Sequence, residues 1–164
     1  MSKVTVMTVL LTVGAAIAVA AVEDTAFVEI SQHYEAIRLA LIKESTDSVA
    51  EHSAAIQNTA RTLKANFSAE AAGVAAAGAA TVQDLLPEII DRSGAVAAAK
   101  DLRSLRSAFA ELTKPLARYH ALVLGDRPVV AYCPMEKKAW LQPDEPIGNP
   151  YAPNMLRCGE VVAR

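Results

Sequence analysis

Three stretches of the chain carry apolar residues at alternating steps of three and four positions, the spacing that places side chains on one face of an α-helix, and a fourth, weaker helical segment lies between the second and the last of them. The first two stripes are Phe27, Ile30, Tyr34, Ile37 and Leu41, then Val49, Ser53, Ile56, Ala60, Leu63 and Phe67. The most regular stripe is Leu102, Leu105, Phe109, Leu112, Leu116, Tyr119 and Val123. Since each helix must bury its stripe against the others, the sequence predicts an all-α domain, an antiparallel four-helix bundle.

Turn and capping residues predict where these helices begin and end. Ser48 and Glu51 have the spacing of a capping box before the second helix. The third segment, over residues 68–92, is rich in alanine and less regular, and Ser93-Gly94 follows it. Small residues permit close approach between helices, so we expect this segment to pack within the bundle. Gly125 is predicted to end the fourth helix.

The composition changes after Gly125, because six of the eight prolines lie beyond it. Such spacing of prolines excludes a further helix. Short strands are expected over residues 128–132 and 139–142, with a third over 159–162. We therefore expect residues 126–164 to form a short irregular or β C-terminal tail that packs on the bundle, with Trp140, Leu141 and Tyr151 supplying the apolar contacts.

The N-terminus has the pattern of a bacterial signal peptide. No charged side chain occurs over residues 4–22, and Ala18-Val19-Ala20 fits the small-x-small preference of signal peptidase, so cleavage before Ala21 is predicted. The alternative is a retained membrane segment, since the stretch nearly reaches the roughly 20 residues that span a bilayer. Both interpretations place a single domain, residues 21–164, in the periplasm, with membrane contact only if residues 1–20 are retained.

All sulfur-containing residues beyond the signal segment fall into two short pieces, Cys133-Pro134-Met135 and Met155-Leu156-Arg157-Cys158. Thiolates and thioethers are soft ligands that suit Cu(I) or Ag(I), whereas the missing Cys-x-x-Cys pairs argue against structural zinc. An oxidising compartment and an even cysteine count equally favour a disulfide between Cys133 and Cys158. The two roles are compatible, because a pair oxidised at rest can bind metal after reduction.

Histidines are the other candidate ligands. His120 lies near the end of the fourth helix, just before the tail, where it is either a nitrogen ligand for the same metal or a residue at the solvent edge of the core. His33 and His52 flank the stripes of the first two helices, where an ordinary structural role is favoured.

Several functional classes are disfavoured. The 16 basic and 18 acidic residues give a formal net charge of −2, and no basic stripe of the kind that binds nucleic acid is present. The sequence lacks a phosphate-binding glycine loop, a Gly-x-Ser-x-Gly elbow and a His-Glu-x-x-His motif, so it does not predict an enzyme.

The tail carries a succession of motifs, namely Tyr132-Cys133-Pro134-Met135, Trp140-Leu141-Gln142, Ile147-Gly148-Asn149-Pro150-Tyr151 and Met155-Leu156-Arg157-Cys158-Gly159. This succession resembles a family of bacterial periplasmic domains of unknown function, which occur alone and fused to the adaptor subunits of copper and silver efflux systems. The resemblance implies a role in metal handling for Cys133, Met135, Met155 and Cys158, and an efflux adaptor or other envelope protein as partner.

Together these features predict a periplasmic protein that binds Cu(I) or Ag(I) and either buffers the metal or delivers it to an efflux system. The alternative is a disulfide-stabilised periplasmic interaction module without metal, in which the Cys133 to Cys158 link serves only as a clamp.

Overall fold

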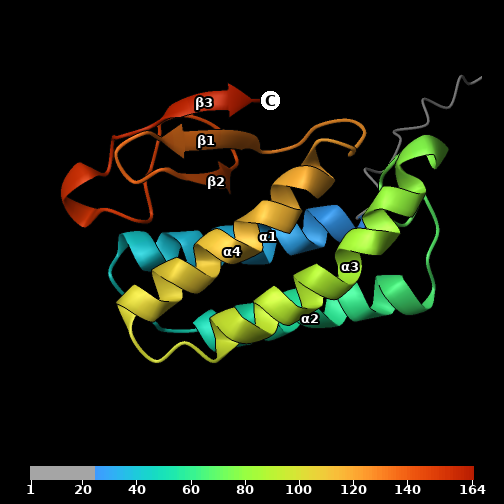
Figure 1. The fold of residues 1–164 in the computed structure, drawn as a ribbon, viewed down its shortest axis with the longest axis horizontal. Coiled ribbons are helices and arrows are strands. Elements are labelled where there is room, and N and C mark those ends of the chain that lie inside the picture. The colour runs from blue at the N-terminus through green and yellow to red at the C-terminus, as the bar shows by residue number, and fades with distance from the viewer. Residues whose placement is uncertain (1–24) are drawn as a thin grey trace, which may run out of the picture.

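A computed structural model describes residues 25–164, and it contains four α-helices followed by a small β-sheet (Figure 1). The helices are α1 (Ala26–Ile42), α2 (Val49–Ala65), α3 (Ala76–Ala97) and α4 (Leu102–His120). Each helix packs against the next in the chain, and α1 also contacts α4, so the helical part resembles a bundle. The predicted signal segment, residues 1–20, lies outside the described residues.

The predicted apolar stripes form the core of the helical part. Every member of the first stripe is at most 2% exposed, and the helix in which it lies ends at Ile42, one residue after its last member. Phe109 and Tyr119 of α4 are fully buried and contact aromatic rings of α1: Phe109 stacks on Tyr34 and Tyr119 meets Phe27 edge-on. Apolar spacing therefore predicted which faces of the helices turn inward.

The third helix extends past the predicted stop at Ser93 and Gly94. The buried Ser93 hydroxyl donates a hydrogen bond back to the carbonyl of Ile89 at 2.6 Å, which keeps the side chain satisfied inside the helix. A Cβ at Gly94 would lie 2.9 Å from the amide nitrogen of Gln57 in α2, so this glycine permits close helix packing. The two small residues are interior contacts of α3, and the prediction that they end the helix was wrong.

The expected capping box at Ser48 is not formed, because Ser48 has a left-handed φ of 58° and makes no capping side-chain hydrogen bond. A capping box forms at α4, where Asp101 accepts the backbone N–H of Ser104 at 2.8 Å and the Ser104 hydroxyl accepts the N–H of Asp101. The hydrogen bond from Ser104 lowers the pKa of the Asp101 carboxyl. The start of α4 is thus fixed locally.

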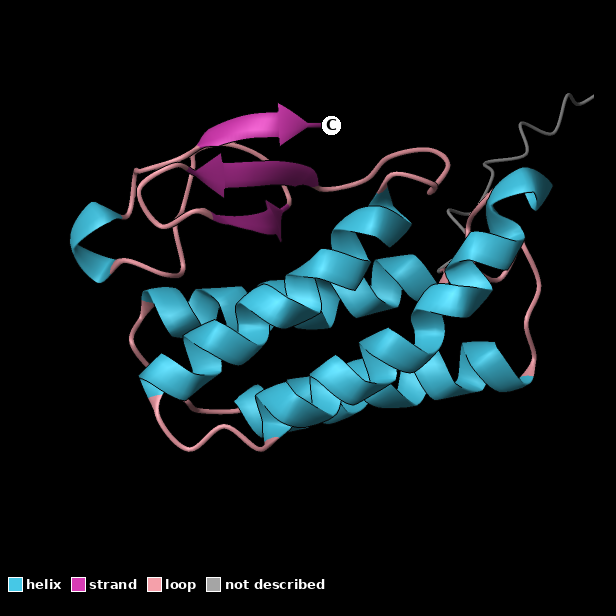
Figure 2. Ribbon diagram, viewed as in Figure 1, coloured by secondary structure: helices cyan, strands magenta, loops and turns pink. Residues whose placement is uncertain are grey.

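Three antiparallel strands follow α4, with the order β2-β1-β3 (Figure 2). They are β1 (Val129–Cys133), β2 (Lys138–Gln142) and β3 (Glu160–Ala163), and a short 3₁₀ helix, η1 (Pro153–Met155), precedes β3. Ala131 of β1 pairs with Trp140 of β2 and with Val161 of β3. The strand predictions are confirmed to within a residue, but a continuous sheet is more than the irregular tail of an all-α fold, so that class description was too narrow.

The sheet packs on α4 and α1 through β2, and the hydrophobic core includes residues of both helices and strands. Tyr34 of α1 lies at the junction: its hydroxyl accepts the N–H of Leu141 at 3.3 Å and donates to the Thr113 hydroxyl of α4 at 2.7 Å, while Thr113 donates to the carbonyl of Phe109. Burial raises the pKa of Tyr34, so the hydroxyl stays neutral. One phenol thus joins α1, α4 and β2.

A second connection fixes the loop after β2. The buried guanidinium of Arg38 in α1 donates to the carbonyl of Gly148 at 2.6 Å and is held by a two-pronged contact to Glu35.

Among residues 25–164, no helix is both long and apolar enough to span a bilayer.

Candidate functional site

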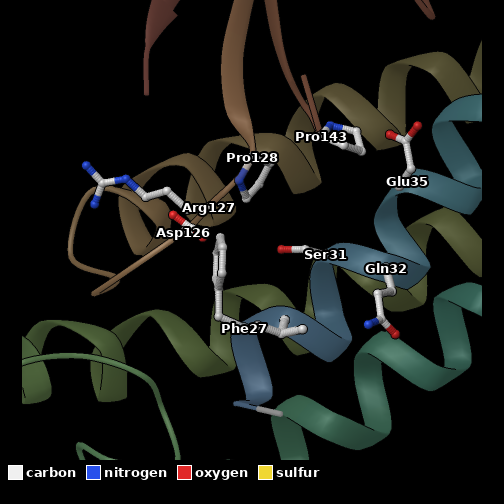
Figure 3. Close-up of a pocket in the computed structure, with 9 residues that line it drawn as sticks. Phe27, Ser31, Gln32, Glu35, Asp126, Arg127, Pro128 and Pro143 are labelled. Atoms are coloured by element: carbon white, nitrogen blue, oxygen red, sulfur yellow. The ribbon is translucent and has the colours of Figure 1, made fainter. Parts of the chain in front are cut away.

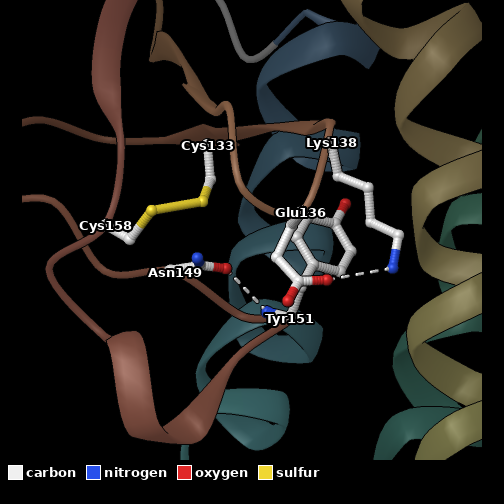
Figure 4. The surroundings of a disulfide bond; sticks show 6 residues. All are labelled: Cys133, Glu136, Lys138, Asn149, Tyr151 and Cys158. Atoms are coloured by element: carbon white, nitrogen blue, oxygen red, sulfur yellow. Dashed lines mark hydrogen bonds and ion pairs between the residues drawn. A yellow bond between two sulfur atoms is a disulfide. The ribbon is translucent and has the colours of Figure 1, made fainter.

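A disulfide joins Cys133, the last residue of β1, to Cys158, just before β3 (Figure 4). The two Cα atoms are 5.7 Å apart, within the usual range for such a bond. The predicted disulfide is therefore present, and it leaves no free cysteine in the described part of the chain. Cys133 is fully buried, whereas Cys158 is partly exposed.

Gly159 determines the path of the chain directly after Cys158. Gly159 has a φ of +148°, and a Cβ there would lie 2.6 Å from the Trp140 ring. Only glycine lets the chain pass this close to the indole and turn into β3. Trp140 is held in turn by Gln142, whose side-chain oxygen accepts the indole N–H at 2.8 Å and the N–H of Gly148 at 3.1 Å.

The segment before Cys158 is folded on itself by backbone hydrogen bonds. The N–H of Asn149 donates to the carbonyl of Leu156 at 2.8 Å, and the side-chain oxygen of Asn149 accepts the N–H of Tyr151. The N–H of Cys158 donates to the carbonyl of Met155 at 2.9 Å, which keeps this methionine on the turn that carries the cysteine. Met155 and Cys158, which the sequence predicts as metal ligands, thus also form a turn through their backbone groups.

The two methionines differ in environment. Met135 lies in the β1–β2 turn and is 72% exposed, whereas Met155, in η1, is partly buried. Each lies within three residues of one member of the disulfide. Because that bond joins two segments separated by 25 positions, it brings both sulfur-containing pieces to one end of the sheet.

His120 lies elsewhere. Its Nε2 donates to the carbonyl of Pro128 at 2.6 Å, its ring packs near Phe27, and the residue is 2% exposed. Burial lowers its pKa, and nearby Arg127 adds to the effect. Pro128 directly precedes β1 and Cys133 ends it, so at about 3.3 Å per residue the two lie roughly 16 Å apart along the strand. The structure does not bring His120 together with the sulfur residues.

A largely apolar cleft of about 530 Å³ lies between α1 and the loops that flank the sheet (Figure 3). Phe27 and Val28 of α1 line it, together with Pro128 and Pro143. Two of its charged residues, Glu35 and Arg127, are engaged within the protein. Glu35 pairs with Arg38, and the Arg127 guanidinium donates to the carbonyls of His120, Val123 and Arg164.

Sequence patterns did not reveal that His33 and His52 meet. Their Nδ1 atoms lie 3.0 Å apart across the contact between α1 and α2. The available signal was weak, namely a histidine beside the apolar stripe of each of two consecutive helices. Over residues 25–164, no three side chains drawn from His, Cys, Asp and Glu lie together in a group that could hold a metal ion.

Comparison of the chain with protein-family models, with curated proteins and with solved structures finds no match in any of the three. The resemblance to domains associated with copper and silver efflux therefore stays a prediction from the tail motifs.

Proposed function

We propose that this chain is an exported, periplasmic protein that binds Cu(I) or Ag(I) when its disulfide is reduced, and that it buffers the metal or delivers it to an efflux adaptor. Cys133 and Cys158 supply the thiolates, and Met155 and Met135 supply weaker thioether ligands. The observation that carries the proposal is the link between Cys133 and Cys158, which gathers all the sulfur-containing residues of the described chain at one end of the sheet.

The chemistry requires a thiol reductant. Two reductant thiols transfer two electrons and two protons to the disulfide, leaving two cysteine thiols and an oxidised reductant. Binding of one Cu(I) then releases the protons, since thiolates are the ligands. A Cα separation of 5.7 Å permits both sulfurs to reach one ion without rearrangement of the backbone. The disulfide is thus the closed form of the site.

The environment of the sulfurs supports exchange of a soft ion. Met135 is largely exposed, Cys158 and Met155 are partly buried, and Cys133 is fully buried, so the ligands run from the surface inward. A thioether at the surface binds the incoming ion weakly, and the thiolates bind it more strongly. Since His120 lies beyond the far end of β1, it is not part of this proposal.

The second candidate is a disulfide-stabilised interaction module without metal. The full burial of Cys133 favours it, because a staple needs no access to solvent. Closing a loop of 25 positions contributes about 3 to 4 kcal/mol on the chain-entropy model. Either function suits an exported protein, since disulfides persist in oxidising compartments.

A competition titration with Cu(I) and a chromogenic chelator separates the two candidates. The reduced protein is expected to bind one ion and the oxidised protein none. Met135→Leu and Met155→Leu should each weaken binding by at least about tenfold, or 1.4 kcal/mol. Cys133→Ser should weaken it further.

His120→Gln is the matched control, because it alters a metal-ligand residue type away from the sulfur residues and should leave the Cu(I) affinity unchanged. An affinity that is the same in Cys133→Ser, Met135→Leu and Met155→Leu as in the parent would overturn the metal site and leave the interaction module.

A further inference from the structure

Two histidine rings meet at the contact between the first two helices. His33 lies in α1 and His52 in the first turn of α2, and both are partly buried. Their ring centroids are 5.3 Å apart, the ring planes differ by 39°, and the Nδ1 atoms are separated by 3.0 Å. Two Nδ1 atoms can share a hydrogen bond only when one carries the proton and the other does not. At least one imidazole therefore directs a lone pair at its neighbour.

The same spacing fits a bound metal ion. Imidazole nitrogen lies about 2.0–2.1 Å from Zn²⁺, so two nitrogens in adjacent coordination positions are about 2.9 Å apart at a right angle and about 3.4 Å apart at the tetrahedral angle. The observed 3.0 Å lies within this interval. A metal ion can thus replace the shared proton once the rings turn so that both Nδ1 lone pairs point at the ion. The displaced proton moves to Nε2 of the same ring by exchange with water, so each imidazole stays neutral.

We propose that His33 and His52 form a divalent-metal site of the imidazole class, suited to Zn²⁺ or Cu²⁺, with both Nδ1 atoms as ligands and water in the remaining positions. Imidazole is a ligand of intermediate hardness, which selects these ions over the soft monovalent ions that thiolates prefer. Because no third His, Cys, Asp or Glu side chain of residues 25–164 completes the group, the ion is exchangeable.

This site is independent of the proposed Cu(I) function. It lies between α1 and α2 and uses no sulfur, so it remains available while the disulfide is closed. The oxidised protein would hold a divalent ion at the histidine pair, whereas only the reduced protein would hold a monovalent ion at the cysteines.

Calorimetric titration of the disulfide-intact full chain with Zn²⁺ alone tests the inference at slightly alkaline pH. Binding of one ion is expected, and His33→Gln and His52→Gln should each weaken it by at least about tenfold. The double variant should be no weaker than the single ones, because one ligand alone does not make a site. Gln32→Ala, an exposed neighbour of His33 on α1, is the matched control and should bind Zn²⁺ like the parent.

Nitrogen-15 NMR of the histidine rings provides a second readout that needs no variant. Zn²⁺ should shift the Nδ1 resonances of His33 and His52 together and leave those of His120 in place. Unshifted His33 and His52 resonances at saturating Zn²⁺, or equal Zn²⁺ affinity in the parent and both single variants, would overturn the site. Neither outcome bears on Cu(I) binding, because the cysteines are oxidised throughout.

Discussion

The helical region and the sheet region of this protein are stabilised by different interactions. Residues 26–120 form four helices whose apolar stripes bury one another, and the largest side chains of α1 and α4 are almost fully enclosed. Residues 129–163 form three short strands, of which β3 is mostly exposed. A sheet this small does not bury enough apolar surface to be stable alone. It depends on a disulfide, on apolar residues such as Trp140 and Leu141 that join the core of the helices, and on a few buried hydrogen bonds to the helices.

The two regions also differ in how well they tolerate substitution, and the proposed metal-binding residues lie in the less tolerant one. Burial of stripes tolerates many apolar substitutions of similar volume. The sheet is also held by single polar groups, such as the Tyr34 hydroxyl and the Arg38 guanidinium. Each makes a directional hydrogen bond that an apolar side chain cannot replace. The residues proposed to bind soft metal lie in the region held by such contacts.

Removing the disulfide should have the largest effect. Cys133→Ala combined with Cys158→Ala is expected to lower the free energy of unfolding by about 3 to 4 kcal/mol, because the staple no longer restricts the unfolded chain. Chemical denaturation of the oxidised parent and the double variant measures the change. Hydrogen exchange should show that amides of β1 and β3 lose more protection than those at the centres of α2 and α3. A uniform loss over helices and strands would contradict the division into two regions.

Removing the junction hydroxyl should have a smaller effect. Tyr34→Phe leaves the buried N–H of Leu141 without its side-chain acceptor, so we expect a loss of about 1 to 3 kcal/mol. Tyr119→Phe is the matched control, since the Tyr119 hydroxyl donates to the carbonyl of Ala72 within the helical region. Hydrogen exchange should report faster opening of β2 in Tyr34→Phe only. Equal exchange of β2 in both variants would show that this hydroxyl does not hold the sheet.

The smallest expected effect is a dependence of stability on pH through His120. Burial lowers the pKa of His120 in the folded protein below its ordinary value of 6.5. The unfolded chain therefore takes up the proton at a higher pH than the folded chain does. Stability is complete above the ordinary value and falls as the pH drops below it, until the folded form is also protonated.

His120→Gln removes this titration while its amide can still donate to the carbonyl of Pro128. Stability measured between about pH 7 and pH 5 should thus decline less in the variant than in the parent. Parallel decline in the two proteins would show that His120 does not titrate differently on folding. The result also bears on the sheet, since His120 bonds to the residue that leads into β1.

Much of the architecture was predictable, because helices and strands have their own sequence periods. The stripes that begin at Phe27 and Leu102 located α1 and α4, although α4 ends at His120 and not at the predicted Gly125, and the short runs around Val130 and Trp140 located two strands. The errors occurred at small polar residues. Ser93 and Gly94 resemble a helix stop in the sequence. In the structure they lie inside α3, because Ser93 bonds to the carbonyl of Ile89 and Gly94 packs closely against Gln57 of α2. Ser48 has capping-box spacing but a backbone conformation that prevents the cap.

The candidate site shows the same limit. Sequence alone identified the sulfur-containing pieces and left the disulfide and the metal site as open alternatives. The structure pairs Cys133 with Cys158 and binds His120 to Pro128 instead of placing it beside them. It also joins His33 to His52, which sequence patterns had left as separate residues.

The sequence by itself determined the helical stripes, the positions of the strands and the clustering of sulfur, because each depends on residues only a few positions apart. Tertiary structure alone decided that the strands form one sheet on α1 and α4, that the two cysteines meet, and that the two histidines face each other. Those outcomes depend on residues far apart in the chain, whose separation is set by the packing of whole helices and strands.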